Sequence, residues 1–201
     1  MISGVTANTP KRLQLDAGAF LKNYDVTQDT WDTAKATKLI GATAGGGSFA
    51  AVPTIRRIEV DGVKGATKGF ETIDEWVVTM TANVKELTAD LLKMALATGS
   101  DTAVKSPSGA SANNYDKIVA SNEIADSNYI GNITWVGRLA GNSKPIIIVL
   151  KNALCTNGLT LTTQDKNEGV IALTLTGHYD PAALDDPPFE IYFPKADAAT
   201  T

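Results

Sequence analysis

The stretch Trp76-Val77-Val78-Thr79-Met80-Thr81-Ala82-Asn83-Val84-Lys85 decides the fold. Successive side chains of a β-strand point to opposite faces of the sheet, so a strand buried on one face repeats its apolar residues with a period of two. This segment does so over its whole length. Its apolar set is Trp76, Val78, Met80, Ala82 and Val84. The segment therefore predicts a β-strand with one apolar and one mixed face.

Other segments predict further strands. Segments 133–136 and 171–176 alternate in the same way, and the β-branched segment 55–60 ends at the turn-forming pair Asp61-Gly62. The run 146–150 is apolar at every position. We expect it to form a central strand, or a strand whose second face is covered by a partner. Together these segments predict a mainly β domain.

One α-helix is predicted directly after the strand at 76–85. Thr88 is placed to cap it, and Asp90 falls in its first turn. One side of the helix is lined by Leu87, Leu91, Met94, Ala95 and Thr98. Leu92 and Leu96 widen this stripe beyond what one sheet face covers. We therefore expect the helix to pack on its own sheet and also to contact another subunit.

The 201 residues predict one domain that spans residues 1–201. Two segments, at about 25–47 and about 100–128, are predicted to be long loops. The first ends in the glycine-rich stretch 41–47, which we expect to be flexible. Loops of this length in a compact domain are usually functional or ordered by a partner.

Composition narrows the classes of partner. The formal net charge is −4, whereas a protein that grips nucleic acid needs a basic surface. Segment 1–10 lacks the apolar core of a signal peptide, and the apolar run 145–150 is too short to span a bilayer. The single cysteine, Cys155, has no partner for an intramolecular disulfide. We therefore expect that the chain folds in a reducing cytoplasm and does not insert into a membrane.

The residues that usually carry catalysis are scarce. His178 is the only histidine, and a lone histidine at a strand end is typical of a structural residue. Cys155 lies in an apolar stretch, which is typical of a buried thiol. No serine lies in a Gly-x-Ser-x-Gly elbow. No catalytic residue is predicted, and the chain is not expected to be an enzyme.

Metal and cofactor sites are not predicted either. One cysteine and one histidine are too few for a structural zinc site. Asp25, Asp29 and Asp32 lack the spacing and glycine of a calcium loop. Segment 45–48 has no lysine where a phosphate-binding loop needs one. The basic residues Arg56, Arg57 and Lys64 are surrounded by acidic residues, which favours a protein–protein contact over a nucleic-acid groove.

Seven stretches, spread in order over most of the chain, carry a family resemblance. They are segments 4–11, 15–20, 40–46, 58–65 (Ile-Glu-Val-Asp-Gly-Val-Lys-Gly), 150–159, 174–180 and 188–194 (Pro-Phe-Glu-Ile-Tyr-Phe-Pro). The chain resembles the major tail tube proteins of siphophages, the long non-contractile-tailed phages, that infect low-GC Gram-positive bacteria. The resemblance implies two packed antiparallel β-sheets, as a sandwich or partial barrel, flanked by one α-helix.

The resemblance also implies a structural role in a virion, without a cofactor. Six copies would form a ring whose inner sheets join into a β-barrel channel, and stacked rings would form the tail tube through which DNA is delivered. The implied partners are further copies of the chain, the tape measure protein, the tail terminator and distal tail proteins, and phage DNA that passes without sequence-specific binding. Assembly would take place in the cytoplasm of the host bacterium.

Three regions are predicted to make the contacts of such a tube. Arg56, Arg57 and Lys64, within the glycine-rich span 40–69, would bridge to a neighbouring ring or subunit. The strand of Trp76, Val78, Met80, Ala82 and Val84 would line the tube. Leu92 and Leu96 would meet an adjacent subunit. The acidic composition predicts net negative charge in the bore, which would keep it from gripping DNA.

Other classes remain open at this point. Within the structural class, the chain could be the tube protein of a contractile tail, a bacteriocin particle or a secretion system. A monomeric β-sandwich binding module is a second class and should stay monomeric in solution. A hydrolase that uses only carboxylates is a third class and needs a pair of carboxylates that lines a cleft.

Overall fold

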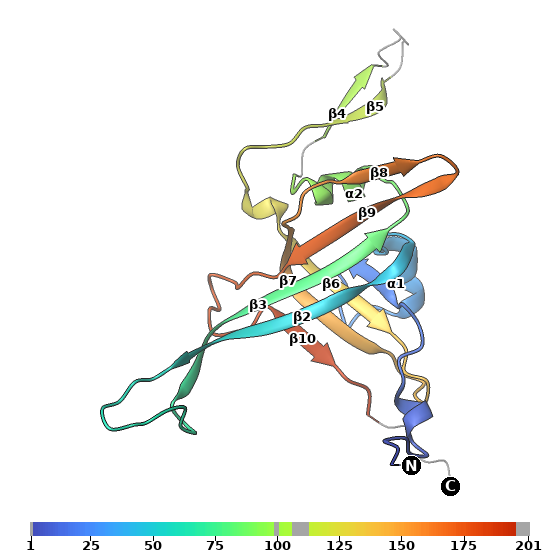
Figure 1. Ribbon diagram of the computed structural model, residues 1–201. Coiled ribbons are helices and arrows are strands. Elements are labelled where there is room, and N and C mark those ends of the chain that lie inside the picture. Colours follow the sequence, from blue (N-terminus) through green and yellow to red (C-terminus); the bar gives the residue numbers. More distant parts are fainter. Residues whose placement is uncertain (1, 99–100, 106–112, 196–201) are drawn as a thin grey trace.

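The computed structural model describes residues 2–98, 101–105 and 113–195 (Figure 1). Its strands are β1 (Ala19–Lys22), β2 (Thr43–Arg57), β3 (Glu71–Val84), β4 (Asp101–Lys105), β5 (Asn113–Ile118), β6 (Ile130–Gly137), β7 (Ile146–Cys155), β8 (Leu161–Gln164), β9 (Asn167–Thr176) and β10 (Phe189–Tyr192). Its α-helices are α1 (Trp31–Thr37) and α2 (Ala89–Ala95), and short 3-10 helices span Thr9–Arg12 and Asp126–Asn128.

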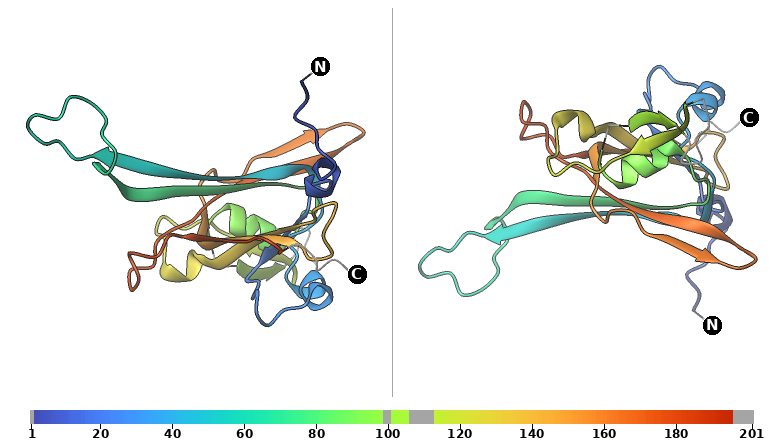
Figure 2. Two further views of the ribbon diagram at one scale, coloured as in Figure 1. Left: turned by 90° about the horizontal axis from the view of Figure 1, so that it is seen from below. Right: turned by 90° about the horizontal axis from the view of Figure 1, so that it is seen from above.

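Eight of these strands form two packed antiparallel layers. Strands β2, β3, β9 and β8 form one layer, and β1, β6, β7 and β10 form the other (Figure 2). The layers are continuous, because β7 pairs with β6 and β10 over most of its length and then with β9 at Leu154 and Cys155. The prediction of a mainly β fold is confirmed, and the two expected sheets are joined through one shared strand.

Strand β7 changes layers at Asn152. This residue has a φ of 45°, in the left-handed region that asparagine tolerates better than other residues with a β-carbon. Its amide Nδ2 donates to the carbonyl oxygen of His178 at 3.2 Å, and Nδ1 of His178 lies 3.1 Å from the carbonyl oxygen of Asn152. These two contacts hold the corner between the layers.

The main core lies between the two layers. Val78, Met80, Ala82 and Val84 of β3 are each 1 % exposed or less, so the alternation that predicted this strand is confirmed. Leu173 and Leu175 of β9 bury the same face of that layer, and Ile133 and Leu150 face them from the other layer. These buried aliphatic side chains supply the main driving force for folding.

A second core explains the apolar run in β7. Ile147 and Val149 belong to a separate cluster with Leu21, Tyr24 and Ala34, while Leu150 belongs to the main core. The β6–β7 layer is therefore buried on both faces, with α1 and its flanking segments on the side away from β3 (Figure 2). The prediction of a central strand is confirmed, and its second face is covered by the chain itself.

The predicted helix is present as α2, but a second helix was missed. The Thr88 side chain accepts a hydrogen bond from the Leu91 amide at 3.1 Å, as expected of the cap. Helix α1 corrects both the prediction of one helix and that of a loop over 25–47. It is capped by Thr30. Because the helix buries only Ala34, its seven residues show no apolar periodicity that could have predicted it.

The other loop predictions need correction as well. Strand β2 begins at Thr43, so the glycines at 45–47 belong to a strand and not to a flexible loop. The segment predicted as a loop over 100–128 contains the β4–β5 hairpin and a 3-10 helix. Residues 106–112 lie outside the described part of the chain. Strands β2, β4 and β5 were not predicted in these segments, because glycine and small polar residues have low strand propensity.

The inner and outer faces of β9 give a direct test of the layered core. We expect Leu173→Ala to lower the free energy of unfolding by about 2–5 kcal/mol, because it leaves a cavity in the main core. The adjacent Thr174→Ala is the matched control on the outer face and should cost about 0.5 kcal/mol or less. Urea unfolding of both variants measures this, and equal losses would contradict the assigned faces.

Candidate functional site

The β2–β3 hairpin extends beyond the body of the protein as an arm (Figures 1 and 2). The two strands stay paired as far as Arg57 and Glu71, and segment 58–70 closes the tip. Near its root, Thr54 pairs with Glu75 and Ile55 with Ile73, so Asp74 is an extra residue that forms a β-bulge. The Trp76 amide donates to the hydroxyl oxygen of Tyr179 at 2.8 Å, which ties the arm to the body.

Aliphatic side chains are exposed along the arm. Val52, Ile55, Ile58, Val60, Ile73 and Val77 are each between 43 % and 59 % exposed. Two pairs of them lie directly opposite each other across the strands, Val52 with Val77 and Ile55 with Ile73. Monomeric proteins rarely expose a series of large apolar side chains on one element, and such series mark interaction surfaces. The arginines of the arm indicated a contact region in the sequence, whereas the exposure of its aliphatic side chains was not predicted.

The structure places all three predicted basic residues on the arm. Arg56 donates from Nε to both carboxylate oxygens of Asp74, at 3.1 and 3.0 Å. Arg57 donates to the carbonyl oxygen of Gly65, and Lys64 is exposed in the tip segment. The two arginines therefore stabilise the shape of the arm, and the role of these residues in a subunit contact stays a prediction.

The side chains named as tube-lining need a correction. Val78, Met80, Ala82 and Val84 are fully buried, and the half-buried Trp76 packs on the same core. In this fold these five side chains point between the layers and away from any lumen. If β3 lines a channel, it does so with the opposite face, which carries Val77, Thr79, Thr81 and Asn83.

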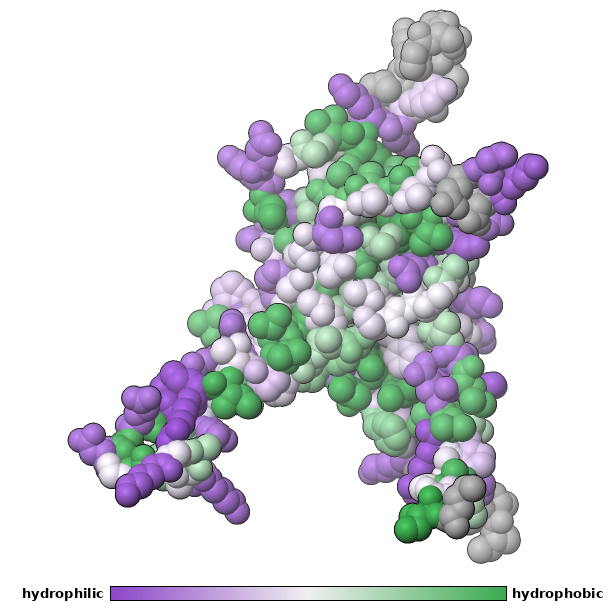
Figure 3. Space-filling model, viewed as in Figure 1, coloured by the Kyte–Doolittle hydropathy of each residue, from purple (hydrophilic) through white to green (hydrophobic). Residues whose placement is uncertain are grey.

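The outer face of this layer is flat and uncharged at its centre. Register places its members side by side: Ser48, Ala50 and Val52 of β2, Val77, Thr79, Thr81 and Asn83 of β3, and Ala172, Thr174 and Thr176 of β9. We call these ten residues the threonine face; Figure 3 shows it as a pale area with few hydrophilic side chains. Hydroxyl groups pair across strands, with Ser48 and Thr81 oxygens 2.8 Å apart. The negative charge expected in the bore does not lie on this face.

Two edges of the same layer end without a neighbouring strand in the described structure. Strand β2 pairs only with β3, and β8 pairs only with β9. An edge presents unpaired backbone N–H and C=O groups that can bind another strand. The bulges in the β2–β3 pairing and Pro53 in β2 are typical devices that limit such pairing along an edge.

The helix residues named for a contact are only partly available. Leu92 and Leu96 are half-buried, and Leu92 packs against the main core. Leu91 and Ala95 are buried completely, as the helix stripe predicted. A contact to another subunit through Leu92 and Leu96 stays a prediction, and Leu96 is the residue less involved in the core.

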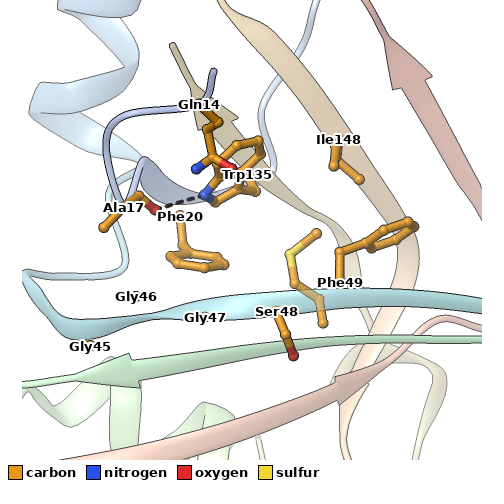
Figure 4. Close-up of a pocket in the computed structure, with 11 residues that line it drawn as sticks. Gln14, Ala17, Phe20, Gly45, Gly46, Gly47, Ser48, Phe49, Trp135 and Ile148 are labelled. Atoms are coloured by element: carbon orange, nitrogen blue, oxygen red, sulfur yellow. Dashed lines mark hydrogen bonds between the residues drawn. The ribbon is translucent and has the colours of Figure 1, made fainter. Parts of the chain in front are cut away.

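A hollow of about 480 Å³ opens beside the first residues of β2. Figure 4 shows Phe20, Phe49, Trp135 and Ile148 above the glycine run 45–47. The indole nitrogen of Trp135 donates to the carbonyl oxygen of Ala17 at 2.9 Å. The lining has no charged side chain and no pair of carboxylates, so it offers apolar and aromatic contacts but no acid–base chemistry.

His178 and Cys155 serve structural roles. His178 holds the Asn152 corner and stacks edge-on against Tyr129 at 5.1 Å between ring centres. Cys155 is buried, and this burial raises the pKa of its thiol, which makes it less reactive. Among the described residues, no group of three or more His, Cys, Asp or Glu side chains is arranged to hold a metal ion.

The acidic segment before α1 is also structural. Oδ1 of Asp25 accepts a hydrogen bond from the Thr27 hydroxyl at 2.7 Å, and this bond lowers the pKa of Asp25. Asp29 accepts from Nζ of Lys38 at 2.5 Å, which lowers the pKa of Asp29. Both carboxylates organise the turn that leads into the helix.

No helix in the described ranges is long and apolar enough to cross a membrane.

These features define a mainly β protein whose distinctive surfaces are an arm, two open sheet edges and a flat uncharged face. No model of a known protein family matches the sequence. A search of curated proteins found no significant match. A function is therefore inferred from the surfaces of this chain and from the family resemblance of its sequence.

Gly47 tests the close packing beside the hollow. A β-carbon at this position would lie 2.0 Å from the carbonyl oxygen of Thr81 and 2.6 Å from Cζ of Phe20. We expect Gly47→Ala to destabilise the protein by about 1–3 kcal/mol, because strand β2 or the Phe20 ring must move. Gly4→Ala has no heavy atom within 4 Å of its β-carbon and is the control. Thermal unfolding of both variants decides, and an unchanged Gly47→Ala would contradict this packing.

Proposed function

We propose that the chain is a structural subunit that assembles with copies of itself into a tube, and that this tube is the tail tube of a long non-contractile-tailed phage. The observation that carries the proposal is the arm, which extends beyond the body and, past its root, exposes the aliphatic side chains of Ile55, Ile58, Val60 and Ile73. Exposed aliphatic side chains of this kind are stabilised when a second subunit covers them and removes them from water.

The open edges support a closed assembly. A layer whose outer strands β2 and β8 both lack a neighbour can pair head to tail with the same layer of the next copy. A head-to-tail contact uses two different surfaces of each subunit, so it adds copies without limit unless the rotation between copies closes it into a ring. A ring of layers forms a barrel, and the barrel removes the exposed edges.

The threonine face supports a channel wall. In such a barrel either face of the β2–β3–β9 layer could line the bore, but its inner face is filled by the main core. The outer face offers hydroxyl, amide and small aliphatic groups without charge at its centre. A wall of this kind makes few strong contacts with a phosphate backbone, because those contacts depend on basic side chains. DNA would therefore pass along it without being held.

The type of particle is inferred from the family resemblance of the sequence. The tape measure protein, the tail terminator and distal tail proteins and the passing DNA are the partners of such a tube. The virion is then its location, after assembly in the host cytoplasm. The surfaces of the chain support a role in a tube, whichever particle that tube belongs to.

A binding module is the second candidate, and the hollow beside β2 favours it. Phe20, Phe49 and Trp135 give this hollow an aromatic lining that suits an apolar or carbohydrate ligand. A binding module would use the hollow as a monomer and would have no use for the arm. The oligomeric state of the purified protein separates the two candidates.

Negative-stain electron microscopy over a concentration series tests the proposal. We expect rings or hollow tubes to appear as concentration rises. Ile55→Ser together with Ile73→Ser should raise the concentration required about tenfold or more, because two apolar contacts of the arm are lost. Val119→Ser with Ile124→Ser is the matched control, since both residues are exposed but lie away from the arm. A protein that stays monomeric at all concentrations contradicts the proposal.

A further inference from the structure

The layer of β1, β6, β7 and β10 carries opposite charge at its two ends. At one end, the β6–β7 turn lies against the start of the chain, since the Gly141 amide donates to the carbonyl oxygen of Lys11 at 3.0 Å and the Ala140 amide to that of Leu13 at 2.9 Å. Asn142 of the same turn donates to the carbonyl oxygen of Lys195 at 3.0 Å. This basic end contains Lys11, Arg12, Arg138, Lys144 and Lys195.

Within the described ranges, the cations of the basic end have no carboxylate partner in an ion pair. Asp16 is the acidic residue beside them, and one of its carboxylate oxygens accepts from the Arg138 amide at 3.2 Å. Leu13 and Leu15 are 48 % and 66 % exposed in the same segment. The basic end therefore presents two aliphatic side chains next to unpaired positive charge.

The opposite end is an acidic corner at the root of the arm. A hollow of about 420 Å³ is lined by the apolar side chains of Ile73, Trp76, Leu184 and Pro187 and by the carboxylates of Asp74, Glu75 and Asp185. Leu184 is 69 % exposed. Asp74 is paired with Arg56, but Glu75 and Asp185 take part in no ion pair of the described structure. This hollow and its carboxylates are the acidic corner.

Further carboxylates add to the charge of the acidic corner. Asp186 and Glu190 share Nζ of Lys151, at 2.8 and 2.6 Å. The hydrogen bond from Lys151 lowers the pKa of Glu190, so this carboxylate stays ionised below its usual range. Five carboxylates thus face two cations in this region. The acidic corner and the basic end lie at opposite ends of the molecule, with the arm at one side and the chain start at the other (Figure 2).

We infer that the acidic corner of one copy receives segment 11–15 of the next copy, with Leu13 and Leu15 against the apolar lining and Lys11 and Arg12 against Glu75 and Asp185. This inference rests on the proposed self-assembly and names the two surfaces that meet. The charges are complementary, and each surface joins exposed apolar groups to unpaired charge, as interfaces do. Because the two surfaces differ, the contact is head to tail and propagates.

Charge reversal tests the inference. One variant carries Glu75→Lys and Asp185→Lys, and the other carries Lys11→Glu and Arg12→Glu; all four residues are exposed. Each variant alone should need a concentration about tenfold or more above wild type to assemble, because like charges meet. An equimolar mixture should assemble near the wild-type concentration, since each variant then offers the surface that the other lacks.

Matched controls separate this effect from a change in net charge. Asp116→Lys with Glu123→Lys, and Lys35→Glu with Lys117→Glu, change the charge equally at exposed positions elsewhere. They should assemble like wild type. The neutral variant Glu75→Gln with Asp185→Asn covers the case in which a reversal disturbs folding. It should assemble less well than wild type, and the assembly of the wild type itself should weaken as salt rises, because salt screens exposed charge.

The outcomes are distinct. Charge-reversed variants that assemble like wild type, or a mixture that fails as its components do, would overturn the inference and leave the proposed self-assembly standing. A wild-type protein that never assembles would overturn both. Sedimentation velocity and negative-stain microscopy of the same samples provide the readout.

Discussion

Strand β7 hydrogen-bonds in both layers, and the fold depends on the turn that it makes at Asn152. The left-handed backbone at this residue lets one strand leave the β6–β10 layer and pair with β9. A side chain with a β-carbon adopts this conformation at a cost, and here the amide of Asn152 and the ring of His178 offset it through their hydrogen bonds. The only histidine of the chain is thereby assigned to architecture.

The turn has a consequence for the surface. By folding the strands into two layers, the chain buries one face of β3 and β9 and both faces of β7. The apolar side chains of these strands are thereby removed from water. It leaves the edges of β2 and β8 unpaired and extends the β2–β3 hairpin past the core. The interior is closed within one copy, whereas the edges of β2 and β8 and aliphatic side chains of the arm stay exposed in the described structure. This contrast is what links the fold to self-assembly in our proposal.

The polar groups of the chain follow the same division. Inside, they close turns and corners, as Asn152 does at β7 and Asp25 does before α1. Outside, they are sorted by type: uncharged groups on the threonine face, carboxylates at the root of the arm, and cations around the start of the chain. A surface sorted in this way suits a protein that acts through contacts between whole faces more than through one reactive cleft.

The sequence alone was enough to predict strands β3, β6, β7 and β9 and the capped helix α2, but not β1 or β10. The alternation at Trp76–Val84 and the Thr88 cap are local signals. They predict a half-buried strand and a helix start without knowledge of the rest of the fold. It also located the arm through the turn at Asp61-Gly62 and the arginines beside it. It did not reveal α1, which buries one residue, or the strand character of the glycines at 45–47. Helix α1 lacks the apolar periodicity that would have marked it, and the low strand propensity of glycine opposes β2, where tertiary contacts override it.

Only the tertiary structure decided which surfaces are exposed. Alternation shows that β3 has two faces, but not that the face of Val78 and Met80 is closed by a second layer while the face of Thr79 and Thr81 is open. Nor does it show that segments 11–15 and 180–187, far apart in the sequence, lie at opposite ends of one molecule. Exposure and the separation of charge depend on contacts between distant segments, and no local pattern encodes those contacts.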